Sequence, residues 1–314
     1  TGNVEIPNRL SFDVEYYAQK LLAMTEAEVG HLYPADEKGN KPIAYYWART
    51  ATCSNPSCRA KVPLLKQFYL ANTKSKKVYL NPIIHGTDIQ FEIKEGSYDE
   101  KALPGWNNRG NMTCPCCGNI TPVDQVKQQF KNKKTSERIL SVIYETNGGK
   151  YYATPHKDNS YQPHLTIENK PNEKMAVENN RNFNTPGWGI DNYGDMFSCR
   201  QLYMLFTLIK NLSQLKSEIN TSEYHQALLT FLAIWFDRIA VANTSLGRWD
   251  NAREGIQTPF SRQAIAMVFD YPESNPFCNS SGSALNQLEW ITRYIESESN
   301  SPFAALFANA SSGE

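Results

Sequence analysis

The chain has 314 residues, enough for about two domains with sizeable hydrophobic cores. Its 32 Lys and Arg balance 32 Asp and Glu, so the formal net charge of zero argues against a uniformly basic nucleic-acid-binding protein. The most apolar run, residues 227–242, is interrupted by Asp237 and Arg238 and is shorter than the about 20 residues of a membrane span. We therefore expect a cytoplasmic protein without a membrane partner.

Residues 1–40 predict an extended lead-in followed by one helix. Ser11 is a residue type that caps helix N-termini, and Gly30 is typical of a helix end. Between them, apolar side chains recur at helical spacing: Val14, Tyr17, Ala18, Leu21, Leu22 and Ala27. The chain starts with Thr1 and ends in an Ala/Ser-rich stretch, so we expect both ends to be cut from a longer protein.

Residues 41–136 predict a β module. An aromatic strand at 42–52 is followed by two β-rich segments, 62–70 and 78–84, that form a hairpin around the Lys-rich turn 71–77. A further strand is expected at 89–93. A helix is expected to start with Thr121 as its cap and Pro122 as its first residue, and to run to about residue 134.

Two pairs of cysteines lie in turn-forming segments of this module. Cys53 and Cys58 are separated from Cys114 and Cys117 by 55 residues, a pattern typical of a tetrahedral Zn(Cys)4 ribbon. Cys116 is the rival ligand in the second pair, but two intervening residues give the usual spacing for chelation. Seven cysteines, an odd number, favour a metal over two disulfides. Four thiolates leave no open position for substrate, so we expect structural zinc, not catalytic zinc.

The β module is also the basic part of the chain. Residues 41–138 hold sixteen Lys and Arg against seven Asp and Glu, an excess of nine. Lys74, Lys76 and Lys77 lie in the turn of the expected hairpin, close to aromatic residues, which suits contact with nucleic-acid phosphates. The alternative is a solvated hairpin tip whose lysines block edge-to-edge aggregation.

The remaining residues divide into two segments. Residues 137–197 predict a strand pair, at 139–144 and 151–153, followed by a long Asn/Pro/Gly-rich connection. Residues 198–314 predict a helical domain. Its helices are expected to start at Ser198 with a capping box to Gln201, at Thr221 or Ser222, and at Ser283.

No catalytic set is recognisable in the sequence. It has no Gly-rich cofactor fingerprint, no nucleophile elbow and no His-Glu-x-x-His motif, so we assign no catalytic and no cofactor-binding residue. Arg248, Trp249 and Arg262 lie in expected loops beside the helices and are candidate DNA contacts. The alternative is an arginine network that holds the helices together.

Several runs of sequence, in this order along the chain, resemble one protein family. They are YYWARTATC at 45–53, PLL at 63–65, CPCCGNITP at 114–122, NTSLGRW at 243–249, FSRQAIAMVFD at 260–270 and NPFCNSSGS at 275–283. The family is that of the prokaryotic adenine-specific DNA methylases that contain a zinc ribbon, often associated with phage defence. The resemblance implies that the zinc ligands are Cys53, Cys58, Cys114 and Cys117. The S-adenosylmethionine-binding and catalytic motifs of the full-length family lie outside this chain, so the resemblance implies an internal segment that is inactive alone.

The expected fold is α+β: a zinc-ribbon-type β module inserted in a mainly helical domain, without a complete Rossmann-like methyltransferase core. The expected function is to bind or position duplex DNA for a methyltransferase core that lies elsewhere, with that core or other defence-system proteins as partners. The competing hypothesis is a structural scaffold or protein-interaction domain without nucleic-acid contact. Binding of RNA instead of DNA cannot be separated from the first hypothesis by sequence, because a basic ribbon serves both.

Overall fold

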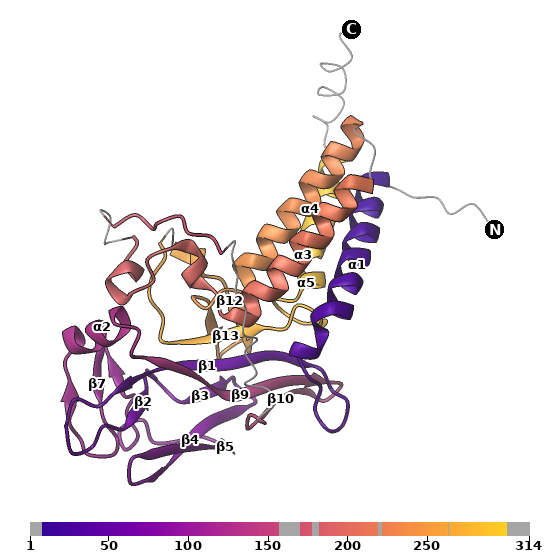
Figure 1. Ribbon diagram of the computed structural model, residues 1–314. Helices are drawn as coiled ribbons and strands as arrows, with labels where there is room; N and C mark the ends of the chain where they lie inside the picture. The colour runs from indigo at the N-terminus through magenta and orange to yellow at the C-terminus, as the bar shows by residue number, and fades with distance from the viewer. Residues whose placement is uncertain (1–7, 157–169, 178–181, 219–221, 263, 300–314) are drawn as a thin grey trace.

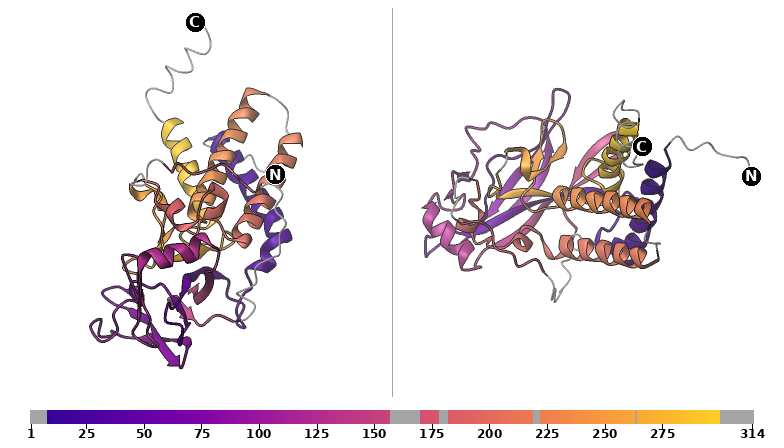
Figure 2. Two further views of the ribbon diagram at one scale, coloured as in Figure 1. Left: turned by 60° about the vertical axis from the view of Figure 1, so that its left-hand side comes forward. Right: turned by 90° about the horizontal axis from the view of Figure 1, so that it is seen from above.

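The computed structural model describes residues 8–156, 170–177, 182–218, 222–262 and 264–299. Long helices and antiparallel sheets occupy different ends of the molecule, with the short helix α2 (Val123–Lys131) at the sheet end (Figure 1), and two further views show the same division (Figure 2). The prediction of a mixed α+β fold is therefore confirmed. Within the described ranges, no helix combines the length and the apolar character needed to cross a lipid bilayer.

Four long helices form a bundle at one end of the molecule: α1 (Arg9–Val29), α3 (Cys199–Glu218), α4 (Glu223–Ala242) and α5 (Ala284–Ser299). Their apolar stripes meet in one core that includes Leu21, Leu205, Leu232, Trp235 and Ile291. Burial of these apolar side chains is the main stabilising contribution within the bundle.

The caps of two helices follow the sequence pattern. At the start of α3, the Ser198 backbone N–H donates to Gln201 Oε1 at 2.7 Å, and the Gln201 N–H donates to Ser198 Oγ at 3.2 Å. Ser222 caps α4 by accepting from the backbone N–H of His225. The expected capping box and the second of the two expected starts, at Ser222, are confirmed.

The cap expected for α1 is wrong by three residues. Asn8 Oδ1 accepts from the backbone N–H of Ser11 at 3.0 Å, so Asn8 is the N-cap. The Ser11 hydroxyl donates instead to Glu296 of α5 at 2.9 Å. A tertiary contact thus uses the side chain that the local pattern assigns to the cap.

The central sheet has the strand order β10, β9, β1, β13, with β2 paired to the end of β1. All pairings are antiparallel. The strands are β1 (Pro42–Thr52), β2 (Lys61–Pro63), β9 (Ser136–Thr146), β10 (Gly149–Ala153) and β13 (Asp270–Ser274). The sheet therefore joins residues that the sequence pattern divides among three segments.

Strand β1 is buried along almost its whole length because it has cores on both faces. Tyr45 and Trp47 pack into the core of the helix bundle. Tyr46 and Ala48, which point the other way, pack into a second core beneath the small β sheets. This double burial explains why neighbouring residues of the strand, Tyr45, Tyr46 and Trp47, can all be large and aromatic.

Strand β13 lies within residues 198–314, for which the sequence predicts a helical domain and no strand. It pairs with β1 from Ala44 opposite Ser274 to Ala48 opposite Asp270. Its Pro272 is tolerated because β13 is an edge strand, which has one side without ladder hydrogen bonds.

The second core supports two smaller sheets. One contains β3 (Tyr69–Asn72), β4 (Lys77–His85) and β5 (Asp88–Glu95), which confirms a hairpin and a following strand. The first arm expected at 62–70 is divided, because residues 61–63 pair with β1 as strand β2 and only 69–72 pair with β4. The other contains β6 (Asn107–Asn108), β7 (Asn111–Thr113) and β8 (Ile120–Thr121) and leads into α2 (Val123–Lys131). Pro122, not Thr121, occupies the N-cap position of α2, which ends at Lys131 rather than about residue 134.

The long connection contains two short 3-10 helices, η3 (Thr185–Trp188) and η4 (Tyr193–Met196). Their side chains Trp188 and Met196 are buried, so this connection packs on the body of the protein. The remaining elements are η1 (Gly30–Leu32), β11 (Arg248–Asp250), β12 (Gly255–Gln257) and η5 (Pro259–Arg262).

Candidate metal centre and basic surface

The first cysteine pair lies in a tight turn between β1 and β2. The Cys53 backbone N–H donates to Ala60 O at 2.8 Å, which closes the turn. Within it, the Cys58 and Arg59 N–H groups both donate to Asn55 O, and Asn55 Oδ1 accepts from the N–H of Ser57 at 3.0 Å. An Asn in this position favours such a turn because its side chain can accept from the backbone two residues further on.

The second pair lies in the turn between β7 and β8. The Cys114 backbone N–H donates to Asn119 O at 2.9 Å, and the Gly118 N–H donates to Cys114 O at 2.8 Å. Gly118 has a φ of 72°, in the left-handed region that glycine adopts at low cost. The glycine after Cys117 therefore allows the chain to reverse directly behind the last cysteine.

Polar side chains join the two turns independently of the cysteines. The Ser54 backbone N–H donates to Thr121 Oγ1 at 3.0 Å, and Asn119 Nδ2 donates to Ser54 Oγ at 2.8 Å. Asn119 Nδ2 also lies 3.8 Å from Cys53 Sγ. These contacts position the two cysteine pairs against each other.

The sulfur atoms of Cys53, Cys58, Cys114 and Cys117 all lie within 4.8 Å of one another. The Sγ–Sγ distance is 3.7 Å between Cys53 and Cys117 and also 3.7 Å between Cys58 and Cys114. A regular tetrahedron with metal–sulfur bonds of about 2.3 Å has edges of about 3.8 Å, whereas a disulfide requires about 2.05 Å. The four cysteines are therefore close enough to bind a metal ion such as zinc, and they are free thiols in the structure.

Cys116 does not belong to this cluster. The set of mutually close ligand atoms contains Cys117 and not its neighbour, although the two residues are adjacent in sequence. The short turn that places Cys114 and Cys117 on the same side accounts for this selection.

Burial and hydrogen bonding shift the pKa of three of the cluster thiols. Cys53 and Cys114 have no exposed surface, and burial raises the pKa of both thiols above the usual range. Cys117 is exposed, and the backbone N–H of Asn119 lowers the pKa of its thiol to about 7. Thiolate is the form that binds metal, and two buried thiolates require a nearby cation, so the donor set fits a divalent ion. A centre with four protein ligands is closed and suits a structural role.

Two of the three candidate lysines in the β3–β4 turn are exposed. Lys74 and Lys77 extend from the turn toward solvent, whereas Lys76 is half-buried. The Lys76 ammonium donates to Glu254 Oε1 at 3.0 Å and to the Lys150 carbonyl, and it lies 5.0 Å from the centre of the Tyr152 ring. Lys76 thus ties the hairpin to β10 and to the segment after β11.

Two other candidate contacts lie beside the hairpin, close to the segment that Lys76 contacts. Arg248 is exposed and Trp249 is half-buried; both belong to β11. The Trp249 indole N–H donates to Leu70 O at 2.6 Å, so this side chain also connects β11 with β3. The side chain of Arg262 lies outside the described part of the structure.

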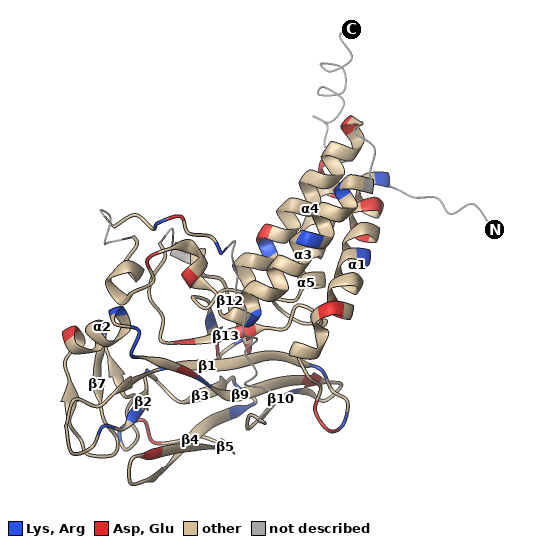
Figure 3. Ribbon diagram, in the orientation of Figure 1, with Lys and Arg blue, Asp and Glu red and all other residues tan. Residues whose placement is uncertain are grey.

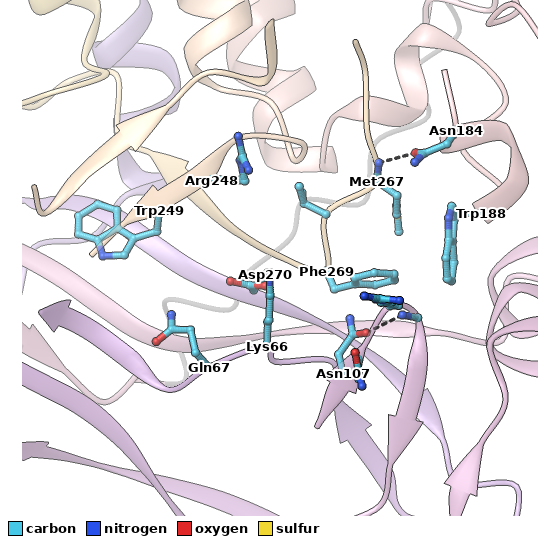
Figure 4. A pocket seen from close by; sticks show the side chains of 14 residues that line it. Lys66, Gln67, Asn107, Asn184, Trp188, Arg248, Trp249, Met267, Phe269 and Asp270 are labelled. Atoms are coloured by element: carbon cyan, nitrogen blue, oxygen red, sulfur yellow. Dashed lines mark hydrogen bonds between the residues drawn. The ribbon is translucent and has the colours of Figure 1, made fainter. Parts of the chain in front are cut away.

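Arg248 and Trp249 line a cavity of about 580 Å³ that the sequence analysis did not identify. In Figure 4, Trp249 and Arg248 lie on one side of the cavity and Trp188 lies on the other. Asp270, Lys66 and Phe269 lie between them. These side chains come from β11, β13 and its preceding segment, η3 and the loop before β3. The only sequence signal for this site is the polar and aromatic composition of residues 243–249.

No protein-family model, no curated protein and no solved structure matches this chain.

Proposed function

We propose that the chain is a metal-stabilised DNA-binding segment that positions duplex DNA for a SAM-dependent adenine-specific DNA methyltransferase. The observation that carries the proposal is the four-thiolate cluster, which joins two turns at the basic end of the molecule. Zinc is the proposed ion because a closed set of four thiolates at these distances is its usual structural site.

Exposed cations around the cluster support contact with phosphates. Arg59 and Lys61 flank the first cysteine turn, and Lys131 and Lys134 lie at the end of α2; all four are exposed. Figure 3 shows this concentration around β2 and α2, whereas the bundle helices carry both signs of charge. With Lys74 and Lys77, these side chains supply mobile positive charge on a sheet-based surface that a metal holds in place.

The assignment to a methyltransferase rests on the sequence motifs quoted above. Those motifs surround the cysteine turns, β11 and β13, which are the segments that form the cluster and the cavity. S-adenosylmethionine would bind to a core outside this chain. That core, or another protein of the same defence system, is the proposed partner.

The test is a titration of duplex DNA with the metal-loaded protein. The variant Lys74→Glu/Lys77→Glu should bind more weakly and reduce the slope of log K against log salt by about two. The matched control Lys20→Glu/Lys216→Glu makes the same change in net charge with exposed residues of α1 and α3, and it should leave binding unchanged. Equal losses in both variants would show a net-charge effect and exclude the hairpin from the interface.

A structural scaffold is the second candidate function, and one observation favours it. Lys76 and Trp249, two of the candidate contacts, make hydrogen bonds within the chain that brace β3 and the hairpin. A scaffold predicts that the metal-loaded protein binds neither duplex DNA nor heparin, and that it binds the missing methyltransferase core.

A further inference from the structure

We propose that the cavity between β11, η3 and the start of β13 binds a nucleotide, with its phosphate on the basic rim and its base against aromatic side chains. The inference goes beyond the proposed function, because a protein without affinity for duplex DNA can still bind a nucleotide here. The ligand is either a free mononucleotide or an unpaired nucleotide within a strand, since both present the same base and phosphate.

Size and charge define the ligand class. The volume of about 580 Å³ lies within the range of about 300–1,000 Å³ for small-molecule sites. Lys66, Arg109 and Arg248 line the cavity against one acidic residue, Asp270. All three cations are exposed, so an anionic group that enters the cavity meets a positively charged rim.

The aromatic walls are rigid. The Trp249 indole is held by its hydrogen bond to Leu70 O and by an edge contact with Tyr152. The Phe269 ring packs at 81° against Trp188, with 4.8 Å between the ring centres. Both Trp249 and Phe269 are half-buried, so part of each ring faces the cavity. A fixed aromatic face is what a base needs for stacking, and it orders no flexible side chain on binding.

Two polar side chains of the cavity lining can hydrogen-bond to the edge of a base. Asp270 Oδ2 accepts from the Tyr46 hydroxyl at 2.6 Å, which orients the carboxylate without using all of its acceptor sites. Asn184 Oδ1 accepts from the backbone N–H of Met267 at 2.7 Å, which orients its amide (Figure 4). One acceptor and one amide, both held in place, suit hydrogen bonding to a heterocycle.

The backbone of Arg109 provides a separate observation. Arg109 has a φ of 53° and Gly110 a φ of 93°, and together they form the two-residue turn between β6 and β7. This turn is pressed against the body of the protein: a Cβ on Gly110 would lie 2.6 Å from Val123 Cγ2 and 3.0 Å from the Trp188 ring. Asn, Asp or Gly is the usual residue at the Arg109 position, and an Arg held there at a steric cost is typical of a functional site.

The experiment measures binding of AMP, CMP and a short single-stranded oligonucleotide to the metal-loaded chain by calorimetry, with ribose 5-phosphate as the ligand without a base. We expect AMP or CMP to bind and ribose 5-phosphate to bind at least about tenfold more weakly, because the stacking energy is lost. Binding of the oligonucleotide without binding of AMP or CMP would assign the site to an unpaired nucleotide in a strand. No binding of any base-containing ligand would overturn the proposal.

Three variants locate the site. Lys66→Glu/Arg248→Glu should weaken nucleotide binding by more than about tenfold, whereas Lys20→Glu/Lys216→Glu, with the same change in charge outside the cavity, should not. Phe269→Leu removes the ring without altering charge and should weaken base-containing ligands selectively by about tenfold. Equal binding by the wild type and the Lys66→Glu/Arg248→Glu variant would contradict the assignment. The two proposals can fail separately. Loss of duplex binding is tested at Lys74 and Lys77, whereas loss of nucleotide binding is tested at Lys66 and Arg248.

Discussion

The side chains of Arg200 and Glu273 form a fully buried ion pair between the helix bundle and the central sheet. Glu273 Oε1 accepts from Arg200 Nε at 2.7 Å, and Oε2 accepts from Arg200 Nη2 at 2.8 Å and from the Trp47 indole N–H at 2.7 Å. The guanidinium carbon lies 4.2 Å from the centre of the Tyr45 ring. Each charge is therefore compensated, which is the condition for keeping such a pair out of water.

Removal of one member of this pair should be strongly destabilising. Glu273→Ala leaves a buried guanidinium without its counter-ion, so we expect the free energy of unfolding to fall by about 3–5 kcal/mol. Glu289→Ala breaks an exposed pair with Arg293 and should cost less than about 1 kcal/mol. Denaturant unfolding of both variants measures the difference. Similar losses would mean that the buried pair contributes no more than a surface pair.

The four cysteines of the cluster differ from Cys116 in their expected contribution to metal binding. Cys114→Ser should abolish tight metal binding, because a ligand of the cluster is lost. Cys116→Ser should retain one metal ion per chain, because its sulfur lies outside the cluster. Metal analysis of the two purified variants shows which cysteine is a ligand. Loss of metal from Cys116→Ser alone would reverse the ligand assignment.

Arg109 links stability to ligand binding at a single position. Arg109→Asn should raise the free energy of unfolding by about 0.5–1 kcal/mol, because Asn tolerates the left-handed backbone better than Arg. The same change should weaken nucleotide binding, because a cation of the cavity rim is removed. Unfolding and calorimetric titration of one preparation provide both readouts. A variant that is less stable than the wild type would show that Arg109 makes contacts that outweigh its backbone strain.

At the scale of secondary-structure elements, the sequence predicts the long helices and the hairpin, because their patterns lie within a few neighbouring residues. The long helices have apolar stripes at regular spacing, and Ser198 and Ser222 supply caps within one turn. The β3–β4 hairpin follows from two β-rich runs around a polar turn. Strand β13 has no such signal: Pro272 and Glu273 are unusual in strands, and they are accommodated here by an edge position and by Arg200. Only tertiary contacts make this segment a strand.

The metal site should stabilise specific elements and not the whole fold. Removal of the metal should speed amide hydrogen exchange in the turn at 53–60 and in β6, β7 and β8, because the cluster links these short elements. Amides of β9 and of the middle of β1 should keep their protection, because cores on both faces bury them. Hydrogen exchange of the loaded and the metal-free protein measures this directly. Equal acceleration in both regions would make the metal a determinant of global stability.

At the scale of the whole molecule, the two sites differ in how far the sequence reveals them. The cysteine cluster is visible in the sequence because four residues of one rare type fall into two turns. The cavity has no such pattern, because its side chains come from segments between about residue 66 and residue 270 that only the complete fold brings together. Lys76 and Trp249 show the same limit, since their contacts within the chain depend on distant strands.

The asymmetric charge of the molecule supports the DNA-binding proposal. Residues 41–138 carry an excess of nine positive charges, and the rest of the chain carries an equal excess of negative charges. The positive charge is therefore concentrated in one part of the sequence. Phosphate contacts made by exposed lysines and arginines release counterions, and binding must then weaken as salt increases.

The most direct test of a metal-stabilised DNA-binding surface is one anisotropy titration of duplex DNA, performed with and without prior removal of the metal at about 50 mM and about 200 mM salt. We predict that the metal-loaded protein binds the duplex and that its affinity falls by at least about tenfold at the higher salt. The metal-free protein should lose duplex binding. Absence of binding by the metal-loaded protein at the lower salt, or binding that survives metal removal unchanged, would contradict this prediction.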